Sequence, residues 1–221
     1  MSEDQNILIF SHDSHCILFY QEINVRSFDS SRVPPPPFCL NWNSFPQNKK
    51  WALEIGAGTG EFARGFCKRN PDWFLLSLER TSNKSQKYFE GSPQQDSNLY
   101  FLRADGINVF AHEKPRPLFD KIFLLYPNPY PKKKQSNLRW HNMPFFQTLL
   151  EFLKPQGQIE FRTNLEWYAE ECKGTLKENF PDLTLFQDNL LTEPLMAQTA
   201  FERKYLERGE QCHQLIYQLN S

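Results

Sequence analysis

Strand-like and helix-like segments alternate along this chain from residue 50 onward, and this alternation constrains the fold more than any other feature. The predicted strands are the short apolar runs at residues 51–55, 73–78, 99–103 and 121–125. The predicted helices are the segments between them, at residues 61–69, 82–89 and 107–111. A strand, a helix and a second strand in this order form a parallel unit, because the helix crosses one face of the sheet. We therefore predict an α/β fold with a mostly parallel, doubly wound sheet.

The C-terminal part of the chain extends this pattern and then departs from it. Residues 143–153 are amphipathic, residues 157–163 predict a fifth strand, and residues 165–177 predict a further helix. Apolar and polar residues alternate at 183–186 and 213–219. We expect these two runs to form an antiparallel pair at the edge of the sheet.

The first 49 residues lack the alternation. Apolar stretches at residues 7–10 and 17–20 precede four consecutive prolines at 34–37, which favour extended backbone. We expect residues 1–49 to form an irregular arm or lid. A chain of 221 residues suits one compact core, so residues 50–221 are predicted to form a single domain.

Composition restricts the class of protein. No run approaches the roughly 18 apolar residues that a membrane span requires, and the N-terminus lacks the basic region of a secretory signal, so we expect no membrane contact and a cytoplasmic location. The five cysteines include no C-x-x-C pair, and we expect no metal site. The net charge of −1 does not indicate a nucleic-acid binder, although basic residues cluster at 132–134, Arg139 and His141. Such a run is more often a solvated face, so it carries little weight alone.

A glycine-rich motif, E-I-G-A-G-T-G at residues 54–60, lies where the first predicted strand meets the first helix. Glycines at such a turn let a ligand approach bare backbone. The dinucleotide fingerprint G-x-G-x-x-G would have a third glycine where this chain has Glu61, so the motif differs from an NAD site. The candidate ligand contacts in this loop are Glu54, Gly56, Ala57, Gly58 and Gly60.

Acidic residues follow the next two predicted strands. Glu79 ends the second strand, where a carboxylate can accept the protons of both ribose hydroxyls of a nucleoside. Asp105 follows the third strand and precedes a predicted helix, so a helix N-cap is one reading of it. Both acids fall at the carboxyl ends of parallel strands, where α/β proteins bind their ligands.

The loop after the fourth predicted strand is stiffened by prolines at positions 127, 129 and 131. It brings Asn128, Tyr130 and three lysines to the carboxyl end of an apolar strand. A surface turn would not require this combination of an amide, an aromatic ring and lysines. The loop is therefore predicted to position chemical groups in the cleft.

These motifs resemble those of the tRNA (guanine-N7) methyltransferases, a family of class I S-adenosylmethionine-dependent enzymes. That family carries F-P-D-P-W-P-K-K where this chain has Y-P-N-P-Y-P-K-K at 126–133. Residues 163–169 resemble its T-D-x-x-x-Y-A motif, residues 199–202 its T-x-F-E motif, and residues 26–28 its R-S-F arm. The glycine loop preceded by an acid resembles motif I of the class I enzymes. Apart from the short R-S-F match, the resemblance extends from residue 50 to the C-terminus.

The resemblance implies a Rossmann-like class I methyltransferase fold with S-adenosylmethionine as cofactor and tRNA as partner, acting as a monomer or a homodimer. It implies cofactor contacts from the glycine loop, from Glu79 and from Asp105 at the adenine amine, and it makes Asn128 the catalytic position. The implied substrate contacts are Lys132, Lys133, Asn164, Thr199, Phe201 and Glu202. Asn128 and Asn164 depart from the family pattern, which has Asp at both positions; each keeps an acceptor oxygen and loses the charge.

Three functions remain open on these residues. Methylation of guanine N7 in tRNA needs orientation rather than a general base, because N7 has a lone pair and no proton. An N-methyltransferase acting on another amine or amide is the second, since Asn128-Pro129-Tyr130 resembles [DN]-P-P-[YFW] with one proline absent. The third is a cofactor- or RNA-binding protein whose two asparagines have silenced transfer. We expect the first, because the second leaves residues 199–202 unexplained.

Overall fold

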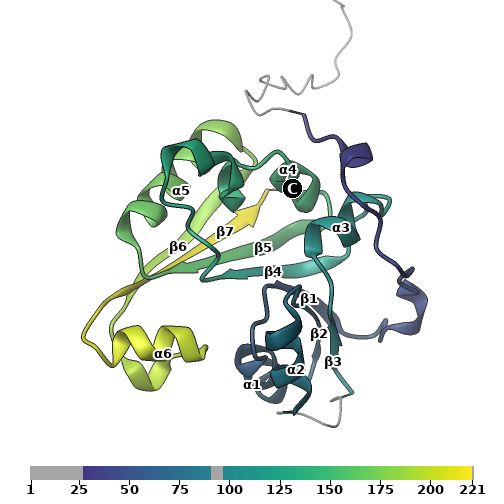
Figure 1. Cartoon of the computed structure of the whole chain (residues 1–221), viewed down its shortest axis with the longest axis horizontal. Helices are drawn as coiled ribbons and strands as arrows, with labels where there is room; N and C mark the ends of the chain where they lie inside the picture. The colour runs from purple at the N-terminus through teal and green to yellow at the C-terminus, as the bar shows by residue number, and fades with distance from the viewer. Residues whose placement is uncertain (1–26, 91–96, 221) are drawn as a thin grey trace, which may run out of the picture.

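The computed structural model describes residues 27–90 and 97–220. The strands are β1 (Lys50–Ile55), β2 (Trp73–Leu78), β3 (Leu99–Leu102), β4 (Phe119–Leu125), β5 (Leu153–Thr163), β6 (Leu183–Leu191) and β7 (Cys212–Leu219). They form one seven-stranded sheet in the order β3-β2-β1-β4-β5-β7-β6 (Figure 1). Strands β1 to β5 pair in parallel, and β7 pairs antiparallel with both β5 and β6. The predicted mostly parallel sheet with an antiparallel C-terminal pair is confirmed.

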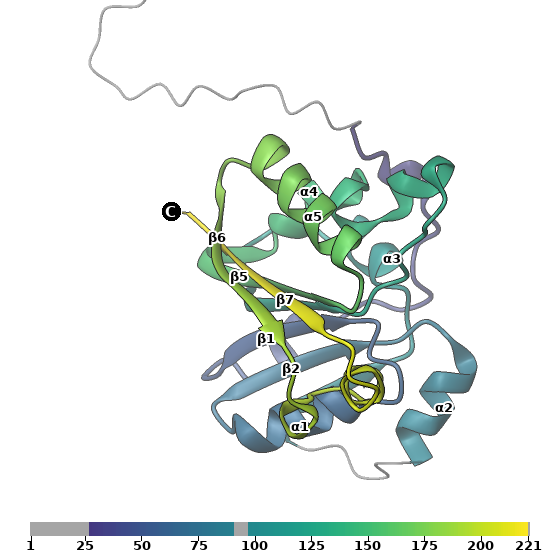
Figure 2. The ribbon, with the colours of Figure 1, turned by 90° about the vertical axis from the view of Figure 1, so that its left-hand side faces the viewer.

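Helices cover both faces of this sheet. They are α1 (Glu61–Arg69), α2 (Ser82–Glu90), α3 (Gly106–Ala111), α4 (Phe145–Leu150), α5 (Glu166–Asn179) and α6 (Ala200–Leu206). Helices α3, α4 and α5 pack on one face, and α1 and α2 pack on the other, where α6 also lies (Figure 1, Figure 2). Five short 3₁₀ turns complete the described elements, at Ser30–Arg32, Trp42–Ser44, Lys133–Leu138, Trp140–Asn142 and Pro194–Met196. None of the described helices is both long and apolar enough to cross a membrane.

Each face of the sheet has its own hydrophobic core. Leu53 of β1 packs with Phe110 and Phe146 on the side of α3 to α5, whereas its neighbour Ala52 packs with Phe62 on the side of α1 and α2. Successive residues of a strand point to opposite faces, so one apolar strand supplies both cores. Mostly apolar strands such as β1 and β2 are therefore what a sheet covered on both faces requires.

The N-terminal segment joins the first of these cores. The apolar stretches at 7–10 and 17–20, and the first residue of the R-S-F match, lie outside the described residues. Trp42 and Phe45 are buried and pack with the core, and the Trp42 indole N–H donates to Glu113 at 2.9 Å. The end of the predicted arm thus packs on the same core as residues 50–221, and the division of the chain at residue 50 stays a prediction.

The structure differs from the sequence-based elements at four places. Helix α4 ends at Leu150, because β5 begins at Leu153 and pairs there with Phe119. The Lys-Pro-Gln-Gly segment, expected to be a turn, is an irregularity inside β5 with a register shift opposite β4. Strand β6 extends well past residue 186, and helix α6 has no counterpart among the predicted helices.

Candidate active site

The glycine loop leaves β1 in a conformation that only glycine adopts readily. Gly56, Gly58 and Gly60 have φ angles of 90°, 60° and 78°. A Cβ atom on Gly56 or Gly58 would meet nothing within 4 Å, whereas one on Gly60 would lie 2.2 Å from the ring of Tyr88. Gly56 and Gly58 therefore keep bare backbone facing open space, and Gly60 is required for packing against α2.

Two buried carboxylates adjoin this loop. Glu54 on β1 accepts a hydrogen bond from the Ser77 hydroxyl at 2.7 Å, and burial raises the pKa of Glu54 to about 7. Glu79, just after β2, accepts from the Gly58 N–H at 2.8 Å and from the N–H and hydroxyl of Thr81 at 2.8 and 2.7 Å. A carboxylate offers about four lone-pair directions, so Glu79 fixes the loop and retains capacity for a ligand.

Asp105 begins α3 as its N-cap. Its carboxylate accepts from the Ile107 N–H at 2.9 Å and lies 3.6 Å from the guanidinium of Arg80, which is largely exposed. The helix-cap reading of this residue is confirmed. A contact with adenine remains compatible with that role, because the carboxylate is partly exposed, and it stays a prediction.

Two adjacent cavities open at the carboxyl ends of the strands. Cavity A has a volume of about 320 Å³, and its predicted site residues are Gly56, Glu79, Asp105 and Asn128. Cavity B has a volume of about 360 Å³, and its predicted site residues are Glu54, Gly56, Ala57, Gly58, Thr199 and Phe201. Both cavities are lined by Gly56, Lys84, Leu125 and Tyr126. Residues from β1, β2, β4 and α6, and from the segment that follows β3, therefore meet in one region. Their contacts with a ligand stay predictions.

The other predicted site residues line neither cavity. Lys132 and Lys133 are exposed where the chain enters the 3₁₀ turn after β4, Asn164 is half-buried in the bend after β5, and Glu202 is completely buried. Contacts from these residues to a substrate remain predictions. Gly60 lies under Tyr88 rather than in a cavity wall. Within residues 27–90 and 97–220, no three His, Cys, Asp or Glu side chains are grouped to hold a metal ion.

Asn128 lies between two tyrosines in unusual backbone conformations. Tyr126 and Tyr130 have φ angles of 50° and 44°, in the left-handed region that non-glycine residues rarely adopt. The Asn128 carbonyl oxygen Oδ1 accepts from the Tyr130 N–H at 3.3 Å. No described residue accepts a hydrogen bond from the Asn128 NH₂ group, so this group is available to a ligand. Each left-handed residue costs on the order of 1–3 kcal/mol and persists only where surrounding contacts fix it.

One set of fixing contacts comes from Arg139. Its guanidinium is buried and donates to the carbonyl of Pro129 at 3.2 Å and to that of Tyr130 at 3.2 and 2.9 Å. The same group forms an ion pair with Glu171 of α5 and lies over the Trp167 ring, 4.9 Å from its centroid. Arg139 therefore ties the loop that carries Asn128 to α5.

This arrangement corrects the basic cluster inferred from the sequence. The sequence groups Arg139 and His141 with the lysines at 132–134, but both are buried. Burial lowers the pKa of His141 to about 4, so its ring is neutral at neutral pH. The sequence could not separate these two residues from the exposed lysines, because the chain turns inward between them. Only Lys132, Lys133 and Lys134 remain of the cluster as an exposed positive run.

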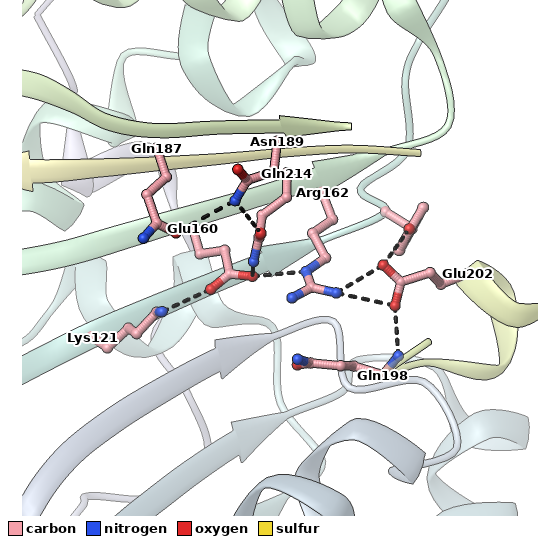
Figure 3. A network of polar contacts seen from close by, with 9 residues as sticks. Lys121, Glu160, Arg162, Gln187, Asn189, Gln198, Glu202 and Gln214 are labelled. Atoms are coloured by element: carbon pink, nitrogen blue, oxygen red, sulfur yellow. Dashed lines mark hydrogen bonds and ion pairs between the residues drawn. The ribbon is translucent and has the colours of Figure 1, made fainter. Parts of the chain in front are cut away.

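A second set of contacts fixes Tyr126. Glu202, at the start of α6, accepts from the Tyr126 hydroxyl at 2.9 Å. It also accepts from Arg162 at 2.8 Å and from the Gln198 N–H at 2.6 Å (Figure 3). The ring of Tyr126 also packs on Phe201, with centroids 5.0 Å apart. Glu202 thus joins α6 to the first residue of the Asn128 loop.

The charge of Glu202 is balanced along a buried chain of ion pairs (Figure 3). Arg162 pairs with Glu160 at 2.7 Å, and Glu160 pairs with Lys121 at 2.7 Å. Burial opposes the charge of Glu160, but Lys121 and Arg162 outweigh that effect and hold its pKa below the usual value. The four charges alternate in sign from β4 through β5 to α6, and the paired charges allow Glu202 to be buried as an anion.

The sequence does not identify Tyr126 and Lys84 as site residues, although both line the two cavities. Burial, followed by the charge of Glu202, raises the pKa of Tyr126, which keeps its hydroxyl a hydrogen-bond donor. The available signal was its position, directly after an apolar strand at the ligand-binding end of the sheet. For Lys84, an exposed lysine on α2, the sequence contains no such signal.

Comparison with known proteins places these features in a family. A family model described as "Putative methyltransferase" matches residues 48–215. The tRNA (guanine-N(7)-)-methyltransferase of Thermotoga maritima is 28% identical over 82% of this chain, and the chain spans 58% of that protein. The enzyme of the same name from Levilactobacillus brevis is 28% identical over 80% of this chain and 84% of its own length.

The fold is also found among solved methyltransferases. The 16S rRNA (adenine(1408)-N(1))-methyltransferase of Catenulisporales acidiphilia, solved as a variant with its cosubstrate SAM, has a TM-score of 0.56 and 13% identity. The likeness covers 78% of this chain and 86% of that one. The predicted resemblance to methyltransferases is confirmed, and with more than half of its residues matched by the family model the chain belongs to this methyltransferase family.

Proposed function

We propose that this protein transfers the methyl group of S-adenosylmethionine to N7 of a guanine in tRNA. Its family and the names of its relatives from Thermotoga maritima and Levilactobacillus brevis support this assignment. One observation carries the proposal: Asn128, Glu79 and Asp105 line the same cavity, cavity A. They follow β4, β2 and β3, respectively.

The carboxylates and the bare backbone of the site fit the proposed cofactor. S-adenosylmethionine is a nucleoside with an ammonium and a sulfonium group and without phosphate. Glu79 has a lone-pair direction left for the ribose hydroxyls, Asp105 can accept from the adenine amine, and Glu54 can pair with the ammonium. The bare backbone at Gly56 and Gly58 gives the ligand room. When bound, the cofactor would supply an electrophilic methyl group.

The residues of the loop after β4 suit guanine as the acceptor. Guanine presents N7 and O6 as adjacent hydrogen-bond acceptors. Oδ1 of Asn128 is bonded to the Tyr130 N–H, so the group it offers is the NH₂ donor. A hydrogen bond from that NH₂ to O6 would orient N7 and leave its lone pair open. No residue has to remove a proton from N7, so orientation is the main task of the protein, and orientation can supply up to about 7–11 kcal/mol.

The same hydrogen bond disfavours an amine or amide substrate. In that alternative, the Asn128 oxygen would have to accept a hydrogen bond from a substrate N–H. The oxygen already accepts from the Tyr130 N–H within the loop, so a substrate N–H would have to use its one remaining lone pair. Guanine needs only the donor side of the amide and therefore fits the loop without rearrangement.

Transfer of a labelled methyl group from S-adenosylmethionine to unmodified tRNA tests the proposal, with mass spectrometry of the digested nucleosides to locate the methyl. We expect 7-methylguanosine. Asn128→Ala should lower the single-turnover rate about 10²-fold, the size of effect expected from misplacing a substrate by about 1 Å, and leave cofactor affinity in calorimetry nearly unchanged. A methyl group on another atom would support the amine or amide alternative. Cofactor or RNA binding with no transfer would identify a non-catalytic binding protein.

A further inference from the structure

Helix α6 presents three distinct faces. Glu202 and Leu206 are buried, and Arg203 forms an ion pair with Glu61 of α1. The remaining face carries Phe201, Lys204, Tyr205 and Arg208, which are spaced i, i+3, i+4 and i+7 and so lie on one side of the turn. The Arg208 N–H donates to the Tyr205 carbonyl at 3.0 Å, so the helical spacing continues to this residue.

The aromatic rings on this face form a continuous row that begins inside the site. Tyr126, which lines both cavities, packs on Phe201 with centroids 5.0 Å apart. Phe201 packs in turn on Tyr205 at 4.7 Å. The side chain of Phe201 is 44% exposed although it is large and apolar. The row therefore extends from the wall of the cavities onto the surface of α6 and leaves ring area open to a ligand.

Cations lie beside the outer ring of the row. The Lys204 ammonium is 5.9 Å and the Arg208 guanidinium 5.8 Å from the centroid of Tyr205. Neither cation forms an ion pair with another described residue, whereas the neighbouring Arg203 is paired with Glu61. Phe201 is exposed and Tyr205 is half-buried. Accessible rings with unpaired cations next to them bind unpaired nucleotides, because bases stack on the rings and phosphates pair with the cations.

We propose that Phe201 and Tyr205, together with Lys204 and Arg208, form a stacking site for unpaired RNA bases next to the nucleotide held in the cavities. The proposal rests on the proposed function in one respect, that the polymer entering the cavities is RNA. It adds a second binding element, on α6, that recognises the unpaired state of the RNA around the target. Continuity with the cavities and the positive charge favour RNA over a protein partner.

Direct binding to short single-stranded oligoribonucleotides tests the site without requiring methyl transfer. Fluorescence anisotropy would compare an oligonucleotide that carries all its bases with an abasic one of the same length. We expect the wild type to bind the base-containing strand more tightly. Tyr205→Leu should weaken that binding about fivefold to tenfold and leave binding to the abasic strand unchanged, whereas Tyr205→Phe should keep wild-type affinity for both.

Two matched variants separate stacking from charge and from general surface effects. Lys204→Gln should weaken binding to both strands by a similar factor and reduce the salt dependence, because it removes a cation that pairs with phosphate. Phe186→Leu is the aromatic control, since Phe186 is 56% exposed on β6 and belongs to neither cavity. It should change neither affinity. Thermal unfolding of each variant checks that α6 stays folded.

Several outcomes would overturn the stacking site. One is equal affinity of the wild type for the base-containing and the abasic strand, even if tRNA is methylated. Another is an equal loss of affinity for both strands in Tyr205→Leu, provided that this variant unfolds at the wild-type temperature. If sedimentation shows that the wild type is a dimer and Tyr205→Leu a monomer, the row of rings is an interface between copies of the chain instead. Conversely, base-dependent binding without methyl transfer would leave the stacking site standing and remove the proposed function.

Discussion

Replacing Arg139 distinguishes a buried clamp from a phosphate-binding residue. The sequence groups Arg139 with exposed lysines, whereas in the structure its guanidinium donates to the carbonyls of Pro129 and Tyr130 and pairs with Glu171. Arg139→Lys keeps the positive charge but loses the planar fork that reaches several acceptors at once. Arg139→Met removes the charge and keeps a chain of similar length.

The loss of stability in Arg139→Lys follows from the hydrogen bonds that arginine makes and lysine cannot. Hydrogen bonds from a charged donor contribute about 1.5–3 kcal/mol each, and a lysine at this position can replace one of the interactions that arginine makes. The Glu171 side chain is 30% exposed, so the ion pair adds little beyond these bonds. We expect Arg139→Lys to lower the free energy of unfolding by about 2–4 kcal/mol, which corresponds to about 5–15 °C in Tm for a chain of this size.

The same substitution acts on the Asn128 loop. Holding Tyr130 in the left-handed region costs on the order of 1–3 kcal/mol, which the Arg139 hydrogen bonds to the Pro129 and Tyr130 carbonyls can offset. Weakening the clamp therefore releases the loop, and the single-turnover rate of methyl transfer should fall about 10²-fold in both variants while cofactor affinity stays close to that of the wild type.

Three measurements decide between the two roles of Arg139: thermal unfolding, single-turnover transfer, and the salt dependence of tRNA binding. A clamp predicts a lower Tm and a slower transfer for Arg139→Lys, with the salt dependence unchanged. If Arg139 instead binds phosphate, the Arg139→Lys variant should match the wild type in Tm and transfer rate. The salt dependence of tRNA affinity should then fall by about 0.7–0.9 in Arg139→Met. The second pattern would refute the clamp. Lys133→Met, on the exposed side of the same segment, is the matched control and should leave Tm unchanged.

Three further predictions concern the cofactor, the RNA and pH. Glu79→Ala should weaken S-adenosylmethionine binding about 10-fold or more in calorimetry, since a charged hydrogen bond contributes about 1.5–3 kcal/mol; wild-type affinity would remove Glu79 from the site. Replacing Lys133 and Lys134 with Gln should flatten the salt dependence of tRNA affinity by about 0.7–0.9 for each phosphate that is no longer neutralised, and an unchanged slope would make the run a solvated face. Burial raises the pKa of Glu54 to about 7 from 4.5, so stability falls as pH rises through that window. Urea unfolding should show Glu54→Gln about 3 kcal/mol more stable than the wild type at pH 8 and equal to it at pH 4, and an advantage that does not grow with pH would contradict this assignment.

The sequence predicts the parallel part of the sheet well because those strands are buried on both faces. β1, β2 and β4 are mostly apolar and largely buried, and their ends fall within a few residues of the predicted ones. The predicted edge strand stops at residue 186, whereas β6 continues to Leu191, since seven of its nine residues are exposed and its polar segment Gln187 to Asn189 gives no burial signal. Its extent is set by pairing with β7.

Helix α6 shows why local pattern is insufficient near the site. Its seven residues include only two that are buried, Glu202 and Leu206, and one of these is charged. In a sequence pattern, a carboxylate predicts a surface position, so α6 shows no apolar periodicity that would predict a helix. Glu202 is buried because Arg162, 40 positions earlier in the chain, lies opposite it on β5. Such a pairing between distant segments is invisible in the sequence. The substrate contact that the family resemblance implies for Glu202 stays a prediction.

The two tyrosines explain how a completely buried Glu202 relates to a cleft that it does not line. Tyr130 is held from one side by Arg139 and α5, and Tyr126 from the other side by Glu202 and α6. Asn128 lies between them, so its placement depends on both helices at once. Thr199 and Phe201 reach cavity B from the same helix that Glu202 anchors. A change at Glu202 would therefore disturb the walls of both cavities through Tyr126 and α6, whether or not Glu202 itself contacts the substrate, which is the behaviour of a positioning residue.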